Sequence, residues 1–109
     1  IVGIIDLSNA CNDFFCYDLS ICINAWCYKE KLDLQKMKSL IRGYNSIRKI
    51  NTQEIKYLNF FLRASSLRFY LSRLMDSQNK KIPKKYNKNP NEYLNKLKYF
   101  QSNNLKKKI

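Results

Sequence analysis

Apolar residues follow two different patterns at the start of the chain. Residues 1–5 form a short, mostly β-branched apolar run that ends in turn-forming residues, which predicts a buried β-strand. Between residues 14 and 26, apolar side chains recur at helical spacing and also fill the other sides of the helix. That pattern predicts a central, buried helix, with residues 7–12 as the connecting loop and Asp13 as the N-cap.

The next stretch has the pattern of an ordinary amphipathic helix. Asp33 is suited to cap it, and the pattern runs to about Arg48. Gly43 lies inside this helix, where glycine costs about 1 kcal/mol relative to alanine, so we expect a close helix–helix contact there. The apolar stripe consists of Leu34, Met37, Leu40, Ile41, Tyr44 and Ile47.

A third helical pattern begins with a capping box. Asn51 is followed three residues later by Glu54, and the periodicity continues to about Gln78. A single helix of that length is long for a compact lobe, so we predict a break near residues 62–66.

The last helical pattern follows a lysine-rich stretch, residues 79–88, which predicts a surface loop. Asn89 is placed to cap the helix, with Pro90 at its first position. The whole chain therefore predicts a mainly α fold, in which one buried strand is followed by four or five helices. The strand has no neighbouring strand of its own here. We therefore expect residues 1–109 to be a single partial domain whose sheet is completed upstream.

The net charge of +13 is unevenly distributed, because residues 1–28 contain three Asp and no Lys or Arg. Such a charge raises nucleic acid as a partner. The excess is mostly lysine, however, scattered among asparagine, isoleucine and tyrosine, which is typical of solvated faces and argues against nucleic-acid binding. No apolar run approaches the roughly 20 residues needed to cross a membrane, so we expect a soluble, cytoplasmic chain.

The four cysteines do not predict a metal site. Their spacing matches no common zinc pattern, and the chain has no histidine to complete a mixed site. We expect reduced, mostly buried cysteines, as in a cytosolic protein.

Several short motifs occur in an order that is specific as a succession, although each alone is weak. They are Gly3-Ile4-Ile5-Asp6, Ala10-Cys11-Asn12-Asp13, Tyr17-Asp18-Leu19, Ile21-Cys22-Ile23-Asn24-Ala25-Trp26-Cys27, Gly43-Tyr44, Arg63-Ala64, Leu67-Arg68-Phe69, Ser72-Arg73-Leu74 and Pro90-Asn91-Glu92-Tyr93-Leu94. In this order they resemble the C-terminal half of homoserine kinases of the aminoglycoside phosphotransferase and choline kinase family. The resemblance covers nearly the whole chain. One departure is Asp6-Leu7-Ser8, where the wider family often has Asp-Phe or Asp-X-Gly; it leaves the carboxylate intact.

The resemblance implies the C-terminal part of the large lobe of a protein-kinase-like α+β fold. It implies transfer of the ATP γ-phosphate to the hydroxyl of homoserine, in threonine biosynthesis. Nothing in the chain resembles the glycine-rich loop, the phosphate-binding lysine or the loop with the catalytic base, which in this family lie upstream. We therefore expect no catalytic residue in this chain and no activity from it alone.

Two carboxylates receive roles from the resemblance. Asp6 would bind the Mg²⁺ that bridges the ATP phosphates, and it is also suited to capping the next turn. Asp18 would be a buried structural carboxylate that accepts backbone hydrogen bonds from the catalytic loop.

Homoserine, the phosphoryl acceptor that the resemblance implies, carries a carboxylate. We expect arginine to bind it, because a planar guanidinium binds a carboxylate through two hydrogen bonds. Arg63, Arg68 and Arg73 recur at five-residue steps, so they cannot all face one pocket from a straight helix. Arg68 is preferred over Arg63 because it lies beyond the predicted break. The alternatives are kinases acting on choline, methylthioribose or an aminoglycoside, and a stand-alone basic helical binding module.

Overall fold

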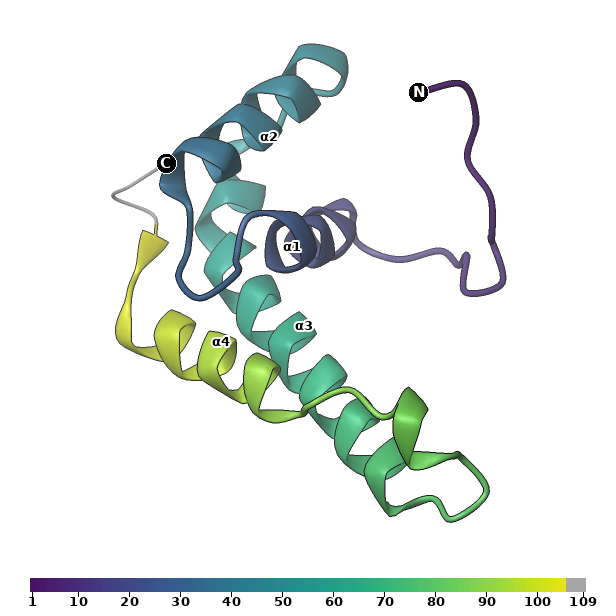
Figure 1. Cartoon of the computed structure of the whole chain (residues 1–109). Coiled ribbons are helices and arrows are strands. Elements are labelled where there is room, and N and C mark those ends of the chain that lie inside the picture. Colours follow the sequence, from purple (N-terminus) through teal and green to yellow (C-terminus); the bar gives the residue numbers. More distant parts are fainter. Residues whose placement is uncertain (106–109) are drawn as a thin grey trace.

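The longest helix is the element on which the others are assembled in the computed structural model, which describes residues 1–105. The order is α1 (Phe15–Trp26), α2 (Leu34–Ile47), α3 (Thr52–Gln78), the 3₁₀ turn η1 (Lys84–Tyr86) and α4 (Asn91–Ser102). Helices α1 and α4 both pack along α3, and α2 joins them through a smaller contact with α1 (Figure 1). A mainly α architecture is therefore confirmed for the described residues.

The core lies where the four helices meet. Its apolar side chains come from the four α-helices, from the segment that connects α1 to α2 and from the residues after α4. Burial of this apolar surface is the main favourable contribution to folding. The buried cluster consists of Leu19, Ile23, Cys27, Tyr28, Leu32, Met37, Leu58, Leu62, Phe100 and Leu105.

The predicted N-caps of α2 and α3 are confirmed, whereas α4 starts one residue later than predicted, with Pro90 at the cap position. The Asp33 carboxylate accepts a hydrogen bond from the Lys36 backbone N–H at 3.1 Å. Asn51 and Glu54 form both bonds of the capping box, at 2.8 and 2.9 Å. Each bond satisfies an N–H group that the helix itself leaves without an acceptor.

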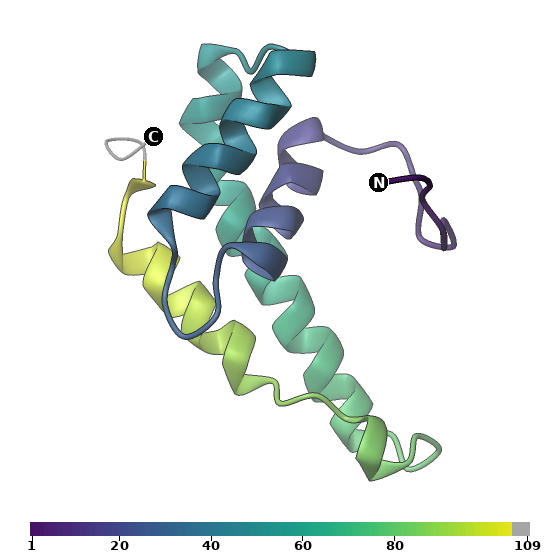
Figure 2. The same ribbon diagram turned by 45° about the horizontal axis from the view of Figure 1, so that its top comes forward.

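The predicted strand is wrong for the described chain. Residues 1–5 have no strand partner within residues 1–105, and Ile1, Val2, Ile4 and Ile5 are all exposed. Both ribbon views show this segment running apart from the helices (Figures 1 and 2). A strand forms only when a neighbour accepts and donates its backbone hydrogen bonds, so the apolar pattern alone does not produce one.

Two predictions about helix interiors are also wrong. Helix α3 is continuous through residues 62–66, where the hydroxyls of Ser65 and Ser66 donate to the carbonyl oxygen of Leu62 at 3.2 and 2.7 Å. Among residues 1–105, Gly43 makes no close helix–helix contact, because a Cβ built there would meet none of their atoms within 4 Å.

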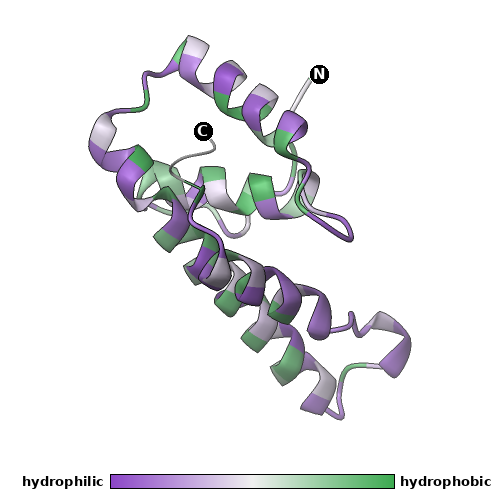
Figure 3. Ribbon diagram, turned by 90° about the vertical axis from the view of Figure 1, so that its left-hand side faces the viewer, coloured by the Kyte–Doolittle hydropathy of each residue, from purple (hydrophilic) through white to green (hydrophobic). Residues whose placement is uncertain are grey.

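Helix α1 is buried on one side rather than all round. Leu19 and Ile23 face the core, whereas Phe15 and Trp26 are 59% and 70% exposed. Its predicted N-cap differs as well: the cap position is Phe14, and the Asp13 carboxylate accepts the Phe14 N–H at 2.7 Å. Figure 3 shows polar and apolar segments alternating along the helices. In residues 1–105, none of the helices is long and apolar enough to span a bilayer.

Candidate functional site

Asp6 adopts an unusual backbone conformation. Its φ of 62° lies in the left-handed region, which few residues other than glycine adopt, although aspartate tolerates it better than most. The Ser8 hydroxyl donates to Asp6 Oδ1 at 2.7 Å, and a turn follows in which the Ala10 N–H donates to the Leu7 carbonyl at 3.0 Å. The carboxylate is exposed, so its oxygens are open to a cation.

The other residues predicted for the site are not gathered around Asp6. Asp18 is exposed on the first turn of α1. Its predicted partner, the backbone of the catalytic loop, is not among the described residues, so its structural role stays a prediction. Arg63 and Arg68 are exposed on α3, which lies apart from the N-terminal segment in both ribbon views (Figures 1 and 2). Because α3 has no break, Arg68 does not lie beyond one, and its position gives no preference over Arg63.

Arg73 has a structural role, because it contacts residues at the start of α4. Its guanidinium donates to the Asn89 carbonyl at 3.0 Å and to the Glu92 carboxylate at 2.6 Å. It also lies over the Tyr93 ring, with its central carbon 4.5 Å from the ring centroid. These contacts attach the start of α4 to α3, and the hydrogen bond from Arg73 lowers the pKa of Glu92 below its ordinary value.

A buried polar network connects three helices. The side-chain amide of Asn24 donates to Ser65 and Ser66 hydroxyl oxygens at 2.8 and 3.1 Å and lies 3.3 Å from the Leu62 carbonyl. Lys96 of α4 reaches the same region and donates to the backbone carbonyl of Asn24 at 2.7 Å. Asn24, both serines and Lys96 are each at most 1% exposed.

Burial changes the pKa of the Lys96 ammonium. Desolvation lowers the pKa of Lys96 below its ordinary value, and Glu92, whose carboxylate lies 3.3 Å away, opposes that shift. The Tyr93 and Tyr28 rings lie 4.2 and 5.5 Å from the ammonium, where their faces attract a cation.

No motif in the sequence predicts this network, although the sequence contains two signals of it. Asn24 interrupts the apolar run from Ile21 to Cys27. Lys96 stands three residues after Tyr93 and four before Phe100, which places it on the face that packs on the core. A polar residue at such a position needs a buried partner.

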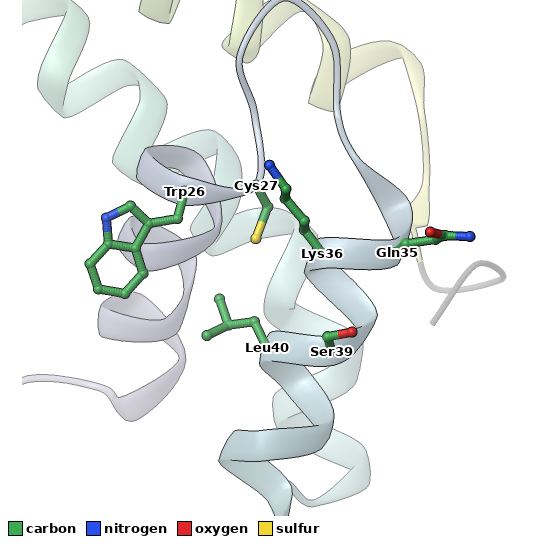
Figure 4. A pocket seen from close by; sticks show the side chains of 6 residues that line it. All are labelled: Trp26, Cys27, Gln35, Lys36, Ser39 and Leu40. Atoms are coloured by element: carbon green, nitrogen blue, oxygen red, sulfur yellow. The ribbon is translucent and has the colours of Figure 1, made fainter. Parts of the chain in front are cut away.

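The cysteines are free, as predicted. Cys16 and Cys27 are buried, Cys22 is half-buried and Cys11 is exposed. Cys27 lines a cavity of about 400 Å³ between the end of α1 and α2, with Trp26, Gln35, Lys36, Ser39 and Leu40 (Figure 4). Burial and then the charge of Asp33 raise the pKa of Cys27, so its thiol stays neutral near pH 7 and is not an activated nucleophile.

An aromatic groove of about 560 Å³ lies between the start of α1 and the first half of α3. Asp13 and Glu54 are among its lining residues, and the Arg48 guanidinium lies 4.1 Å from the centroid of the Phe15 ring. Its aromatic lining consists of Phe14, Phe15, Tyr57, Phe60 and Phe61.

Comparison with known proteins gives a consistent result. The chain is similar to homoserine kinases. The relatives include those of Allorhizobium ampelinum (41% identical), Agrobacterium fabrum (40%) and Sinorhizobium fredii (38%), each over 106 residues. The match covers 92% of this chain but 32% of each relative, so the chain spans about a third of their length. No family model matches the chain.

Proposed function

We propose that this chain is part of a cytoplasmic homoserine kinase, which transfers the γ-phosphate of ATP to the side-chain hydroxyl of homoserine. The observation that carries the proposal is the similarity to homoserine kinases at about 40% identity across nearly the whole chain. The ordered motifs in the sequence support the same assignment. Within it, the helices would be the C-terminal part of the large lobe of a protein-kinase-like fold, from the aminoglycoside phosphotransferase group.

Asp6 is the residue proposed to contact Mg²⁺. Mg²⁺ prefers oxygen ligands, and in phosphoryl-transfer sites it is held by one or two carboxylates together with phosphate oxygens and water. An exposed aspartate with one oxygen fixed by Ser8 fits that requirement. Within residues 1–105, no cluster of three or more His, Cys, Asp or Glu could hold a metal. The ion, when bound, would neutralise charge on the ATP phosphates.

Arg68 is the residue proposed to bind the homoserine carboxylate. Arg73 is occupied by Glu92, whereas Arg68 is exposed and has no ion-pair partner within residues 1–105. The Arg68 guanidinium lies 4.9 Å from the centroid of the Phe69 ring, which restrains its direction. Arg63 is the second candidate on the same helix.

A chimera tests the assignment directly. The matched third of the Agrobacterium fabrum homoserine kinase would be replaced by this chain, so that the relative supplies the remaining two thirds. We expect Mg²⁺-dependent phosphorylation of homoserine, with kcat/KM within about 100-fold of the intact relative. Choline, methylthioribose and an aminoglycoside serve as competing acceptors. A soluble chimera that binds ATP but phosphorylates another acceptor in preference to homoserine would contradict the proposal.

A further inference from the structure

Helix α3 has a second apolar face in addition to the one that faces the core. Its buried face consists of Leu58, Leu62, Ser65 and Ser66, which meet α1 and α4. A second series recurs in steps of three and four residues along nearly the whole helix: Tyr57, Phe60, Ala64, Leu67, Leu71 and Met75. At 3.6 residues per turn this series forms one narrow stripe on the side away from the buried face.

The stripe is open in the described structure. Tyr57, Phe60, Leu67, Leu71 and Met75 are between 44% and 70% exposed. Scattered apolar residues on a surface need no explanation, but a continuous row of them marks an interaction site.

The stripe also continues into a concave surface. Tyr57 and Phe60 belong both to it and to the groove of about 560 Å³ between α1 and α3. Phe14 and Phe15, from the start of α1, form the far wall of that groove and are themselves 70% and 59% exposed. An occupant of the stripe would therefore extend into a pre-formed aromatic pocket at one end.

Positive charge borders the stripe. Lys56 and Arg63 stand seven residues apart, so they lie on the same side of α3, along one edge of the apolar row, and both are exposed. Arg68 lies at the opposite edge. This arrangement matches the charged positions that flank the apolar seam of a coiled coil and select the partner.

We propose that the exposed stripe, with its border of Lys56 and Arg63, is the docking surface for an amphipathic helix whose own apolar row is bordered by carboxylates. From Tyr57 to Met75 the row is about 27 Å long, which a partner helix of about five turns would cover. Helices seated in apolar rows of this kind contribute residues at spacings of three and four.

A second copy of this chain is a poor occupant. In an antiparallel pair the Lys56 and Arg63 edge would face itself, and in a parallel pair it would face the edge that carries Arg68. Both arrangements bring like charges together, which destabilises the pair. A helix bordered by Glu or Asp relieves that repulsion.

The source of the partner helix rests on the proposed function. Homoserine kinases are about three times as long as the matched segment. We assign the partner helix to the two thirds of the polypeptide that this chain does not match. The stripe would then be an internal interface of the whole enzyme rather than a site for a separate protein.

Two synthetic peptides test whether the stripe of the 109-residue chain prefers a helix bordered by carboxylates. Both are five-turn helices with the same leucine row, bordered by Glu in one and by Lys in the other. We expect the Glu peptide to bind at least about tenfold more tightly, as measured by calorimetry, and salt to weaken it. Leu71→Ser and Phe60→Ser should each weaken the Glu peptide by about tenfold. Ile47→Ser, which changes an exposed apolar residue on α2, should leave binding unchanged.

Several results would overturn the proposal. They are equal affinity for the two peptides, no binding of the Glu peptide, or equal losses from Leu71→Ser and Ile47→Ser. A dimer of the chain that dissociates on Leu71→Ser would make a second copy the occupant, which also contradicts the proposal.

The assignment of the partner helix to the rest of the enzyme is tested in the chimera with the Agrobacterium fabrum homoserine kinase. Leu71→Cys, in a background carrying Cys11→Ser, should react with a maleimide at least about tenfold more slowly in the chimera than in the 109-residue chain. Ile47→Cys is the matched control and should react at similar rates in both. If Leu71→Cys reacts at the same rate in the chimera as in the 109-residue chain, the internal interface is refuted. These measurements involve no turnover, so an inactive chimera with a protected Leu71→Cys would refute the proposed function alone.

Discussion

The ammonium of Lys96 donates a hydrogen bond to the backbone carbonyl of Asn24 across 2.7 Å, although the two residues lie on different helices. Asn24 belongs to the last turn of α1, where carbonyl groups have no partner within the helix. A cation is also favourable at a helix C-terminus because of the helix dipole. Lys96 therefore links the end of α1 to α4 through the interior of the protein.

Replacing Lys96 with methionine keeps the aliphatic stem and removes this donor. The change relieves the desolvation of a buried charge, but it leaves the Asn24 carbonyl buried without its hydrogen bond. We expect the free energy of unfolding to fall by about 1–2 kcal/mol, since an unsatisfied buried group costs about 1–3 kcal/mol. Urea denaturation followed by circular dichroism would measure it. Lys98→Met, an exposed change on the same helix, should stay within about 0.5 kcal/mol of wild type.

Gly43 allows a prediction in the opposite direction. It lies inside α2, and a Cβ there would meet no atom of the described part of the chain within 4 Å. Gly43→Ala should therefore raise the free energy of unfolding by about 0.5–1 kcal/mol, because alanine loses less conformational entropy in a helix. A rise in the melting temperature would show this. If the variant were less stable, Gly43 would have a packing role that the structure does not show.

Acid should weaken the fold through two glutamates. A hydrogen bond from Arg48, followed by one from the Asn51 N–H, lowers the pKa of Glu54, and a hydrogen bond from Arg73 lowers the pKa of Glu92. Both folded values lie below the ordinary value of 4.5, so the unfolded state binds more protons in acid. The stabilisation is fully present above that value and is lost as the pH falls through the folded values.

Urea denaturation at a series of pH values between neutral and strongly acidic measures this loss. Glu54→Gln and Glu92→Gln should each flatten the decline. Glu30→Gln, in the exposed connection between α1 and α2, is the control and should leave the decline unchanged. A wild-type chain whose stability does not change between neutral pH and pH well below 4.5 would contradict the assignment.

How far the sequence predicts this structure depends on the range of each interaction. The caps at Asp33 and Asn51 are predicted because donor and acceptor lie three residues apart. The strand fails because strand formation depends on a partner that the local pattern does not contain. Lys96 and Asn24 are 72 residues apart, so their bond follows from helix packing rather than from any motif. For the candidate site, only the break in α3 is contradicted, because the helix is continuous; the roles of Asp6, Asp18 and Arg68 depend on partners outside the described residues and stay predictions.

Arg68→Lys tests the proposed acceptor contact in the chimera. Lysine keeps the positive charge but removes the planar pair of donors that a carboxylate accepts. We expect KM for homoserine to rise by about tenfold, while KM for ATP remains nearly unchanged. Arg63→Lys provides the comparison. If both variants keep the wild-type KM for homoserine and lose thermal stability, these arginines support the fold and the carboxylate is bound elsewhere.

Asp6→Asn tests the proposed metal contact, also in the chimera. Asparagine preserves the size of the side chain and can still accept from Ser8, so the turn with φ of 62° should persist. It removes the negative charge that a hard divalent cation prefers. Losing a metal carboxylate costs several kcal/mol of transition-state stabilisation, so kcat should fall by at least about 100-fold. The Mg²⁺ concentration that gives half-maximal rate should rise with it. Asp13→Asn, which changes another exposed carboxylate, one that accepts the Phe14 N–H, should affect both quantities little. A kcat for Asp6→Asn within about threefold of the unmodified chimera would show that Asp6 serves the turn alone.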